Sequence, residues 1–378
     1  MAMRIAVLHK GSDFWSAGGV FTETVVRSLR HAAGTGVDIV VLSNQSVAGW
    51  QDLATVVELP NTQRFPGETT LRQVLRLKGV AESYCDAHGI SALLLAGDFQ
   101  AKRVRYKRIP WIPDFQHKHL PQYFAPAEIS HLERRLQHWA RHAEAVVLSS
   151  ASAQEDYNRF LPHAAKTVVA RFPSLFVYTP PSPDLSITPA AYGLPEKFVL
   201  VANQFWAHKN HQVVVDAVAI LARKGITVPV ACTGLPADYR DPSNQAVSSL
   251  LQAIASNGLS GQVVPLGLVP RAHLIDLLRC ASLVVQPSRF EGWSTIVQDA
   301  LALGRPVICS DIAVHREQAP NALGFFDCDD PARLAQILEV AWPALRPGPD
   351  PAREAIGLAV QQPLAVEHGR ILLRLCSE

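Results

Sequence analysis

One segment in the second half of the chain combines an acid, a glycine and the start of a helix. After the apolar run Ser282–Val285, which we predict to be a strand, Glu291 and Gly292 precede Ser294 and Thr295. Ligands of open α/β sheets bind beyond the carboxyl ends of the strands, and the first amides of a helix can hold a phosphate. Gly292 lets the backbone approach a ligand closely. The segment therefore predicts an anion-binding loop.

A second acid in this segment, Asp299, follows Thr295 by four residues. In a helix this spacing places both side chains on one face. A carboxylate there suits the two hydroxyls of a ribose. A capped helix that carries an unrelated acid has the same spacing and stays an alternative.

A cation stands at a second turn from strand to helix. Lys209 lies in the stretch Asn203–His211, directly after the apolar run Phe198–Ala202. A lysine at such a turn can offset the negative charge of a diphosphate. A solvated lysine in the first turn of a helix is the alternative.

The first half of the chain offers two weaker candidate sites. Gly18 and Gly19 follow the apolar run Ile5–Leu8, and we expect them in a loop before a helix over Thr22–Ala33. Paired glycines let a loop approach a bulky ligand, although a plain turn explains them equally well.

The second candidate of this half follows the apolar pair Trp111–Ile112. Asp114 and His117 lie there within four residues of one another. Either side chain could contact a bound ligand, and we favour His117, whereas a packing role in the loop needs no chemistry at all.

The sequence pattern predicts that two α/β domains position these residues. Short apolar runs alternate with helical patterns, which predicts parallel sheets covered by helices on both faces. Residues 172–195 contain six prolines, which block regular helix and interior strand, so we interpret them as a linker. We expect domains over residues 1–180 and 181–345 and a tail helix over 346–378. The tail could bury its apolar stripe by returning to the first domain.

Composition limits the class of partner. With 35 lysines and arginines against 33 acids, the formal charge is +2, which argues against a nucleic-acid binder held by phosphate contacts. The five basic residues within Lys102–Arg108 could face an anionic lipid surface or form a solvated face. The six cysteines form no C-x-x-C pair, and we expect neither a metal nor a cofactor.

Hydrophobic patterning predicts the compartment. No stretch approaches the roughly 20 apolar residues of a membrane span, and the first residues do not resemble a signal peptide. We therefore expect a soluble cytoplasmic protein, with peripheral contact at the inner face of a membrane left open.

The segment Pro287–Pro306 resembles the E-x7-E signature of glycosyltransferase family 4, whose members are retaining enzymes with the GT-B fold. Glu291 matches the first acid and the shorter Asp299 the second. The resemblance continues through Gly304–Asp311 and covers nearly all of the second half, but it is thinner in the first half. The stretch Asn203–His211 is similar to a subgroup found among surface-polysaccharide glycosyltransferases. The family usually has Gly-Arg where this chain has Asn203 and Gln204, so one usual cation is missing.

The resemblance implies two Rossmann-like domains that face each other across a cleft. It implies an enzyme that moves a sugar from a UDP- or GDP-sugar to a glycan or lipid-linked acceptor, without a metal, in surface polysaccharide biosynthesis. It implies catalytic roles for Asp114, His117, Lys209 and Glu291. It implies that the donor-binding residues are Gly18, Gly19, Asn203, Gln204, Lys209, Leu268, Val269, Glu291, Gly292, Trp293, Ser294, Thr295 and Asp299. A non-catalytic sugar-nucleotide-binding protein and an epimerase of the same fold remain alternatives.

Overall fold

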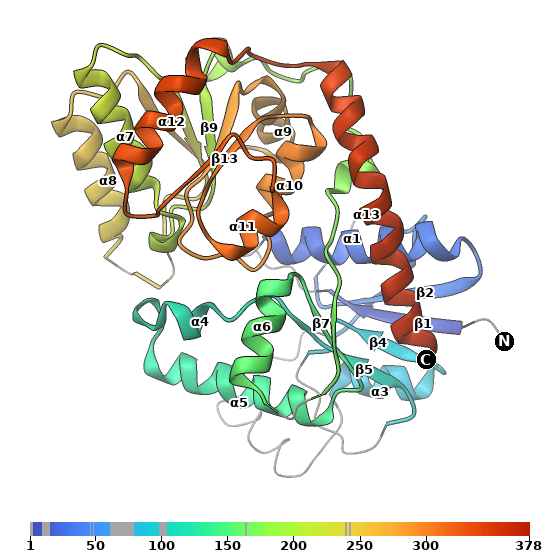
Figure 1. The fold of residues 1–378 in the computed structure, drawn as a ribbon. Coiled ribbons are helices and arrows are strands. Elements are labelled where there is room, and N and C mark those ends of the chain that lie inside the picture. Colours follow the sequence, from blue (N-terminus) through green and yellow to red (C-terminus); the bar gives the residue numbers. More distant parts are fainter. Residues whose placement is uncertain are drawn as a thin grey trace. The chain divides into compact units, whose positions relative to one another are not determined.

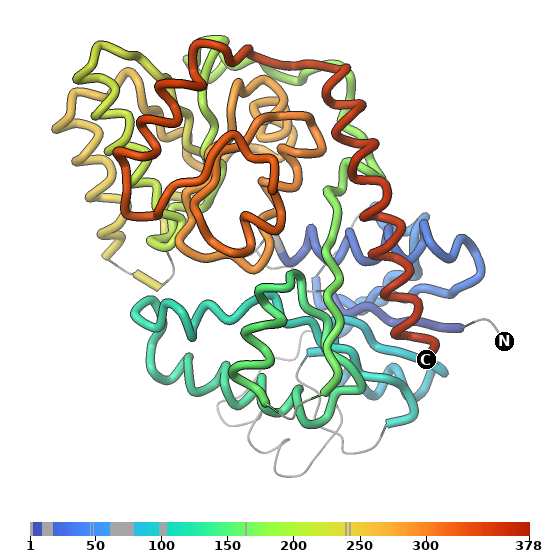
Figure 2. The backbone as a smooth tube through the Cα atoms, in the orientation of Figure 1, coloured from blue at the N-terminus to red at the C-terminus, as the bar shows by residue number. Residues whose placement is uncertain are grey.

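The computed structural model describes residues 3–9, 16–45, 47, 49–60, 79–97, 104–162, 165–238, 240–241 and 243–378. The chain divides into two compact units, and its course is traced in Figures 1 and 2. The first unit consists of Met1–Phe115, Pro126–Tyr178 and Gln362–Glu378, and the second of Gln116–Ala125 and Thr179–Gln361. The short segment Gln116–Ala125 is thus part of the second unit, although the residues on both sides of it belong to the first.

The first unit contains a parallel sheet of five strands in the order β3-β2-β1-β4-β5. The strands are β1 (Met3–Leu8), β2 (Val37–Ser43), β3 (Thr55–Glu58), β4 (Ala92–Leu94) and β5 (Lys107–Ile109). A second parallel sheet pairs β7 (Val146–Leu148) with β6 (Trp111–Ile112) and β8 (Thr167–Val169). The centre of β1 is fully buried, and this strand contains the apolar run Ile5–Leu8 that the sequence pattern singles out.

Helix α1 (Ser16–Ala33) begins earlier than the sequence pattern predicts. Gly18 and Gly19 therefore lie in its first turn and not in a loop before it, so that expectation was wrong. The hydroxyl of Thr22 donates to the carbonyl of Gly18 at 2.8 Å, one helical turn back along the chain.

Among the described residues, the other helices of the first unit are α3 (Val80–Ala87), α5 (Pro126–His142), α6 (Ala151–Phe160) and the last part of α13 (Pro351–Ser377). That last part of α13 packs against α1 (Figure 1). Ser28 Oγ lies 2.7 Å from His368 Nδ1, and a Cβ on Gly369 would lie 2.4 Å from the Ser28 carbonyl oxygen. The missing side chain at Gly369 lets the two helices come this close.

The second unit is built on a parallel sheet of six strands in the order β11-β10-β9-β12-β13-β14. The strands are β9 (Val199–Ala202), β10 (Val230–Thr233), β11 (Val263–Gly267), β12 (Leu283–Gln286), β13 (Val307–Ser310) and β14 (Gly324–Phe326). From β9 the sheet grows one way through β10 and β11 and the other way through β12 to β14. The strand order therefore reverses between β9 and β12.

Helices of the second unit cover this sheet, and they are α7 (His211–Arg223), α8 (Gln245–Ser256), α9 (Arg271–Cys280), α10 (Thr295–Ala302), α11 (Ala313–Gln318) and α12 (Pro331–Ala341). The short helix α4 (Gln116–His119) also belongs to this unit. Residues 172–195 hold only the 3-10 turns η2 (Leu175–Val177) and η3 (Pro189–Tyr192), which confirms the expected lack of regular helix or strand.

Candidate functional site

Polar side chains meet where the strand order of the second unit reverses. Asn203 follows β9, Gln286 ends β12, and the Asn203 amide donates to Gln286 Oε1 at 2.9 Å. At the end of β10, Gly234 has a φ of +144°, and a Cβ there would lie 2.1 Å from the Asn203 carbonyl oxygen. Only glycine fits at that position. In open α/β sheets such a reversal, at the carboxyl ends of the strands, is where ligands bind.

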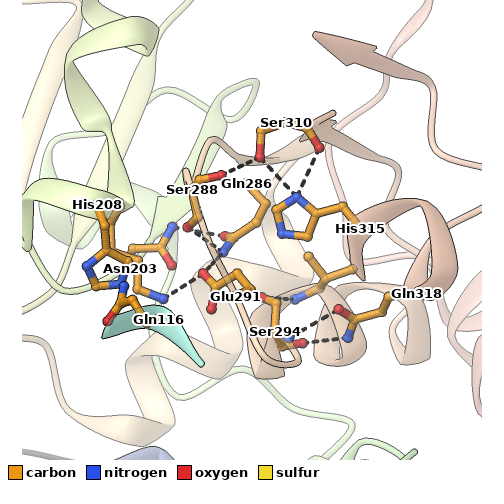
Figure 3. Close-up of polar contacts among 12 residues, drawn as sticks. Gln116, Asn203, His208, Gln286, Ser288, Glu291, Ser294, Ser310, His315 and Gln318 are labelled. Carbon is orange, nitrogen blue, oxygen red and sulfur yellow. Dashed lines mark hydrogen bonds and ion pairs between the residues drawn. The ribbon is translucent and has the colours of Figure 1, made fainter. Parts of the chain in front are cut away.

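The sequence-predicted residues Lys209 and Glu291 form an ion pair beside this point. Lys209 Nζ lies 2.6 Å from Glu291 Oε1, and the two side chains are 15% and 9% exposed. The Gln286 amide donates to the same carboxylate oxygen at 2.8 Å (Figure 3). The structure thus brings together a cation and an acid from loops more than 80 residues apart in sequence.

The charge of Glu291 is maintained by its lysine. Burial alone would raise the pKa of this carboxyl, but the Lys209 ammonium and its hydrogen bond outweigh burial and hold the pKa below its ordinary value. Glu291 is therefore ionised at neutral pH, and the pair carries one full charge of each sign into a site largely shielded from water.

The backbone around Lys209 is held by its neighbour Asn210. Lys209 ends the 3-10 turn η4 (Ala207–Lys209), and Asn210 follows in the left-handed conformation with φ 55°, which asparagine tolerates better than most residues. Its amide donates to the carbonyls of Pro287 at 3.3 Å and Cys328 at 2.9 Å. The Arg289 amide donates to the His208 carbonyl at 2.8 Å. These bonds connect the loops after β9 and β12, so Lys209 and Glu291 are positioned together.

A buried histidine supports the wall of this site. His315 Nδ1 lies 3.0 Å from Ser310 Oγ, whose hydroxyl donates to the Ser288 carbonyl (Figure 3). Burial lowers the pKa of His315 to about 4, although the charge of Glu291 acts in the opposite direction. His315 is therefore neutral at physiological pH and adds no positive charge near Glu291.

The start of α10 differs from the expected phosphate cradle. Ser294 caps the helix, because its Oγ accepts from the Val297 amide at 3.4 Å. The Ser294 amide, however, donates to Gln318 Oε1 at 3.1 Å, and the Gln318 amide donates back to the Ser294 carbonyl at 2.7 Å. The side chain of Gln318 thus accepts one hydrogen bond from the Ser294 backbone and donates another to it. The Ser294 amide therefore already has a partner within the protein. Thr295 is the first residue of α10 and is half-buried.

Asp299 lies one helical turn after Thr295 in α10 and is buried. Its Oδ2 lies 3.4 Å from Nη2 of Arg271, the first residue of α9. Arg271 has a half-exposed side chain and was not among the residues that the sequence singled out. The ribose contact assigned to Asp299 stays a prediction.

The remaining predicted donor residues occupy the ends of β9, β11 and β12. Gln204, at the usual place of an arginine, accepts a hydrogen bond from the Leu235 amide through its Oε1 at 2.6 Å. This bond stabilises the loop after β10. Leu268, directly after β11, is 68% exposed, and Val269 beside it is half-buried. Gly292 and Trp293 lie between Glu291 and the helix cap and are half-buried.

The candidates of the first half separate between the two units. His117 lies in α4, is buried, and belongs to the second unit together with Lys209 and Glu291. Asp114 is half-buried and, like Gly18 and Gly19, belongs to the first unit. Asp114 and His117, which the sequence places close together, thus belong to different units, because the boundary falls after Phe115.

The predicted basic patch is only partly described by the structure. Lys102 and Arg103 lie outside the described residues. Arg105 is exposed, but Arg108 is buried and its guanidinium donates to the His142 carbonyl at 2.9 Å. Arg108 therefore serves the interior of the first unit, and the expectation that all five basic residues face outward, toward a lipid or toward solvent, was wrong at this residue.

Two features of the described residues bear on the metal and membrane predictions. Among them, no three or more histidine, cysteine, aspartate or glutamate side chains are grouped so that they could hold a metal ion. In the same part of the chain, no helix is long and apolar enough to cross a membrane.

Comparison with known proteins gives the context of this geometry. Residues 195–341 match the family model described as Glycosyl transferases group 1. None of the curated proteins matches the chain. Among solved structures, sucrose-phosphate synthase from Thermosynechococcus elongatus superposes with a TM-score of 0.71 at 14% identity, covering 99% of both chains.

Two further similar structures have the same architecture. HepE from Anabaena, in a complex with UDP and glucose, has a TM-score of 0.64 at 16% identity and covers 98% of this chain and 95% of its own. The α,α-trehalose-phosphate synthase from Burkholderia vietnamiensis has a TM-score of 0.67 at 12% identity and covers 100% of both chains. The expected GT-B fold is thereby confirmed.

Proposed function

We propose that this protein is a glycosyltransferase, which transfers a sugar from a nucleotide-sugar donor to a glycan or lipid-linked acceptor. The match of residues 195–341 to the Glycosyl transferases group 1 model and the GT-B fold support this proposal. The observation that carries the proposal is the largely buried ion pair of Lys209 and Glu291 at the reversal of strand order. This is the position at which the fold binds ligands, and a pair of opposite charges there suits a ligand with both an anionic group and hydroxyls.

Each side chain of the pair has a proposed task. When the bond between sugar and diphosphate breaks, negative charge builds up on the departing diphosphate, and the Lys209 ammonium is already in place to stabilise it. Glu291, ionised and oriented by the Gln286 amide, accepts hydrogen bonds from hydroxyls of the donor sugar. Asp299 binds the ribose in this proposal, which gives the donor a contact on each side of the diphosphate.

We propose a UDP-sugar as the first donor to test and a GDP-sugar as the second. Supporting this order, structures similar to this chain were solved with UDP and glucose, with UDP-glucose and with UDP-2-fluoro glucose. The sugar is proposed to keep its anomeric configuration, with the acceptor attacking the face that the diphosphate leaves. Surface polysaccharide is the proposed product, and a lipid-linked acceptor would bring the protein to a membrane surface.

The test measures nucleotide release from a panel of UDP-, GDP- and ADP-sugars, with and without glycan and lipid-linked acceptors. The proposal predicts acceptor-dependent release from one donor, and the anomeric configuration of the product then follows from NMR coupling constants. Co-sedimentation with anionic vesicles tests the membrane contact. Donor binding without release in the presence of every acceptor class would favour a non-catalytic binding protein instead.

A further inference from the structure

The segment Gln116–Ala125, which carries His117, is attached to the second unit by an arginine far away in sequence. Arg240 lies in the loop between β10 and α8, and its Nη1 donates to Gln116 Oε1 at 3.2 Å. Its guanidinium also lies 5.5 Å from the centre of the Phe124 ring, near the other end of the segment. One side chain thus contacts both ends of the segment.

The rest of the Arg240 guanidinium is used within the second unit. Nε donates to Asp238 Oδ1 at 3.1 Å, and Nη2 lies 3.3 Å from Asp238 Oδ2 and 3.0 Å from His208 Nδ1. The side chains of Arg240 and Asp238 are 6% and 4% exposed. The Trp206 ring lies 5.1 Å from the guanidinium, within the range of a cation–π contact.

Arg240 is therefore a paired charge at the centre of a polar cluster. Burial lowers the pKa of His208 well below its ordinary value, and the charges of Lys209 and Arg240 lower it further. His208 is then neutral, so its Nδ1 can accept a hydrogen bond from Arg240. With its charge balanced by Asp238 and its donors aimed at protein groups, Arg240 is not placed as the substitute for the arginine missing at Gln204.

Two other contacts of the segment reach the neighbours of the proposed catalytic pair. The His119 ring lies 5.1 Å from the ring of Phe290, which precedes Glu291. The Tyr123 ring lies 6.5 Å from that of His208, which precedes Lys209. The segment therefore packs on both loops that carry the ion pair.

We propose that Arg240 is a positioning residue of the transfer reaction, which holds the segment Gln116–Ala125, and with it His117, against the loops of Lys209 and Glu291. The effect of Arg240 on catalysis rests on the proposed function, whereas its attachment of the segment rests on the contacts alone. This role requires the planar guanidinium of an arginine, because Asp238, His208 and Gln116 are bound at once in different directions. A lysine keeps the charge and loses the planar group.

Hydrogen–deuterium exchange tests the structural part. The amides of Leu120, Tyr123 and Phe124 donate hydrogen bonds within the segment, so their exchange reports whether it stays folded. In Arg240→Met and Arg240→Lys we expect exchange of residues 116–125 to rise about tenfold or more, as loss of hydrogen bonds to a charged group implies. Peptides from α7 and α12 are expected to stay unchanged.

A control at a second arginine–aspartate pair and a milder variant keep this test decisive. Arg316 is also paired with an aspartate, Asp311, and lies 4.6 Å from the centre of the Phe325 ring, so Arg316→Met is expected to leave residues 116–125 unchanged. Should Arg240→Met unfold the second unit, Gln116→Met removes the hydrogen bond from Arg240 Nη1 and leaves the Arg240 side chain in place. Unchanged exchange of the segment in the folded Arg240 variants, or in Gln116→Met in that event, would overturn the proposal.

Kinetics test the link to the reaction. In the Arg240 variants we expect kcat to fall on the order of 10²-fold, as misplacement of a substrate-contacting group does, while the donor dissociation constant stays unchanged. A weaker donor affinity with normal kcat would show that Arg240 is a diphosphate ligand and would overturn the positioning role. If the wild-type protein transfers no sugar, the proposed function fails, whereas the exchange result still decides whether Arg240 holds the segment.

Discussion

Replacing Lys209 by methionine removes an ammonium that lies 2.6 Å from a buried carboxylate. Glu291 would then be largely buried without its counter-charge, and the cost of about 3–5 kcal/mol for breaking a fully buried pair is an upper bound here. The pKa of Glu291 is now held low by Lys209, so we expect it to rise in the variant until the carboxyl binds a proton. Lys209→Met is thus predicted to lose thermal stability, and the loss is expected to be larger at pH 8 than at pH 5.

The double variant Lys209→Met/Glu291→Gln separates stability from catalysis. It removes both charges together, so we expect most of the lost stability to return, since a buried pair contributes little once both members are replaced. Activity is expected to stay low, because a neutral site cannot stabilise the departing diphosphate. We predict a kcat/KM at least about 10²-fold below wild type in both variants.

Thermal unfolding followed by circular dichroism and steady-state nucleotide release are the two assays. The reasoning is refuted if Lys209→Met has near-normal kinetics, or if the double variant regains activity together with stability. Either result would make the ion pair a structural feature only.

Three further predictions concern the same protein. Asp299→Ala is expected mainly to raise KM for the donor, and Glu291→Ala mainly to lower kcat; the reverse pattern in initial-rate kinetics would exchange their roles. Activity is expected to survive excess EDTA, and a loss restored by Mg²⁺ or Mn²⁺ would contradict metal independence. Burial lowers the pKa of His211 and His368 to about 3 and that of His315 to about 4. Below pH 6.5 the unfolded chain binds protons that the folded one does not, so each histidine lowers the free energy of unfolding by about 1.4 kcal/mol per pH unit. His368→Gln is expected to reduce the fall of Tm between pH 6.5 and 4.5, and an unchanged fall would contradict this.

Much of the second unit could be predicted from the sequence because its signals are local. Apolar runs identified its strands, and the residues directly after a strand must lie at one edge of a parallel sheet. Lys209 after β9 and Glu291 after β12 could therefore be expected near one another, and their ion pair is consistent with that expectation. Gln286, the last residue of β12, could have been found by the same reasoning.

Other parts of the site depend on distant contacts that leave no local pattern. Arg240 meets Gln116 across 124 residues, and nothing near either residue marks the pair. Gln318 satisfies the Ser294 amide from 24 residues away, which the capping signal at Ser294 does not reveal. Arg108 looked like one of several surface cations, but a neighbouring carbonyl makes its burial possible.

A crystal structure of the protein with an unreactive UDP-sugar analogue tests the central claim most directly. The account predicts the nucleotide at the carboxyl ends of β9 and β12, with a diphosphate oxygen within hydrogen-bond distance of Lys209 Nζ, about 2.7–3.2 Å. The donor sugar is predicted beside Glu291 and the ribose beside Asp299. A nucleotide bound elsewhere, with Lys209 still paired only to Glu291, would contradict the account.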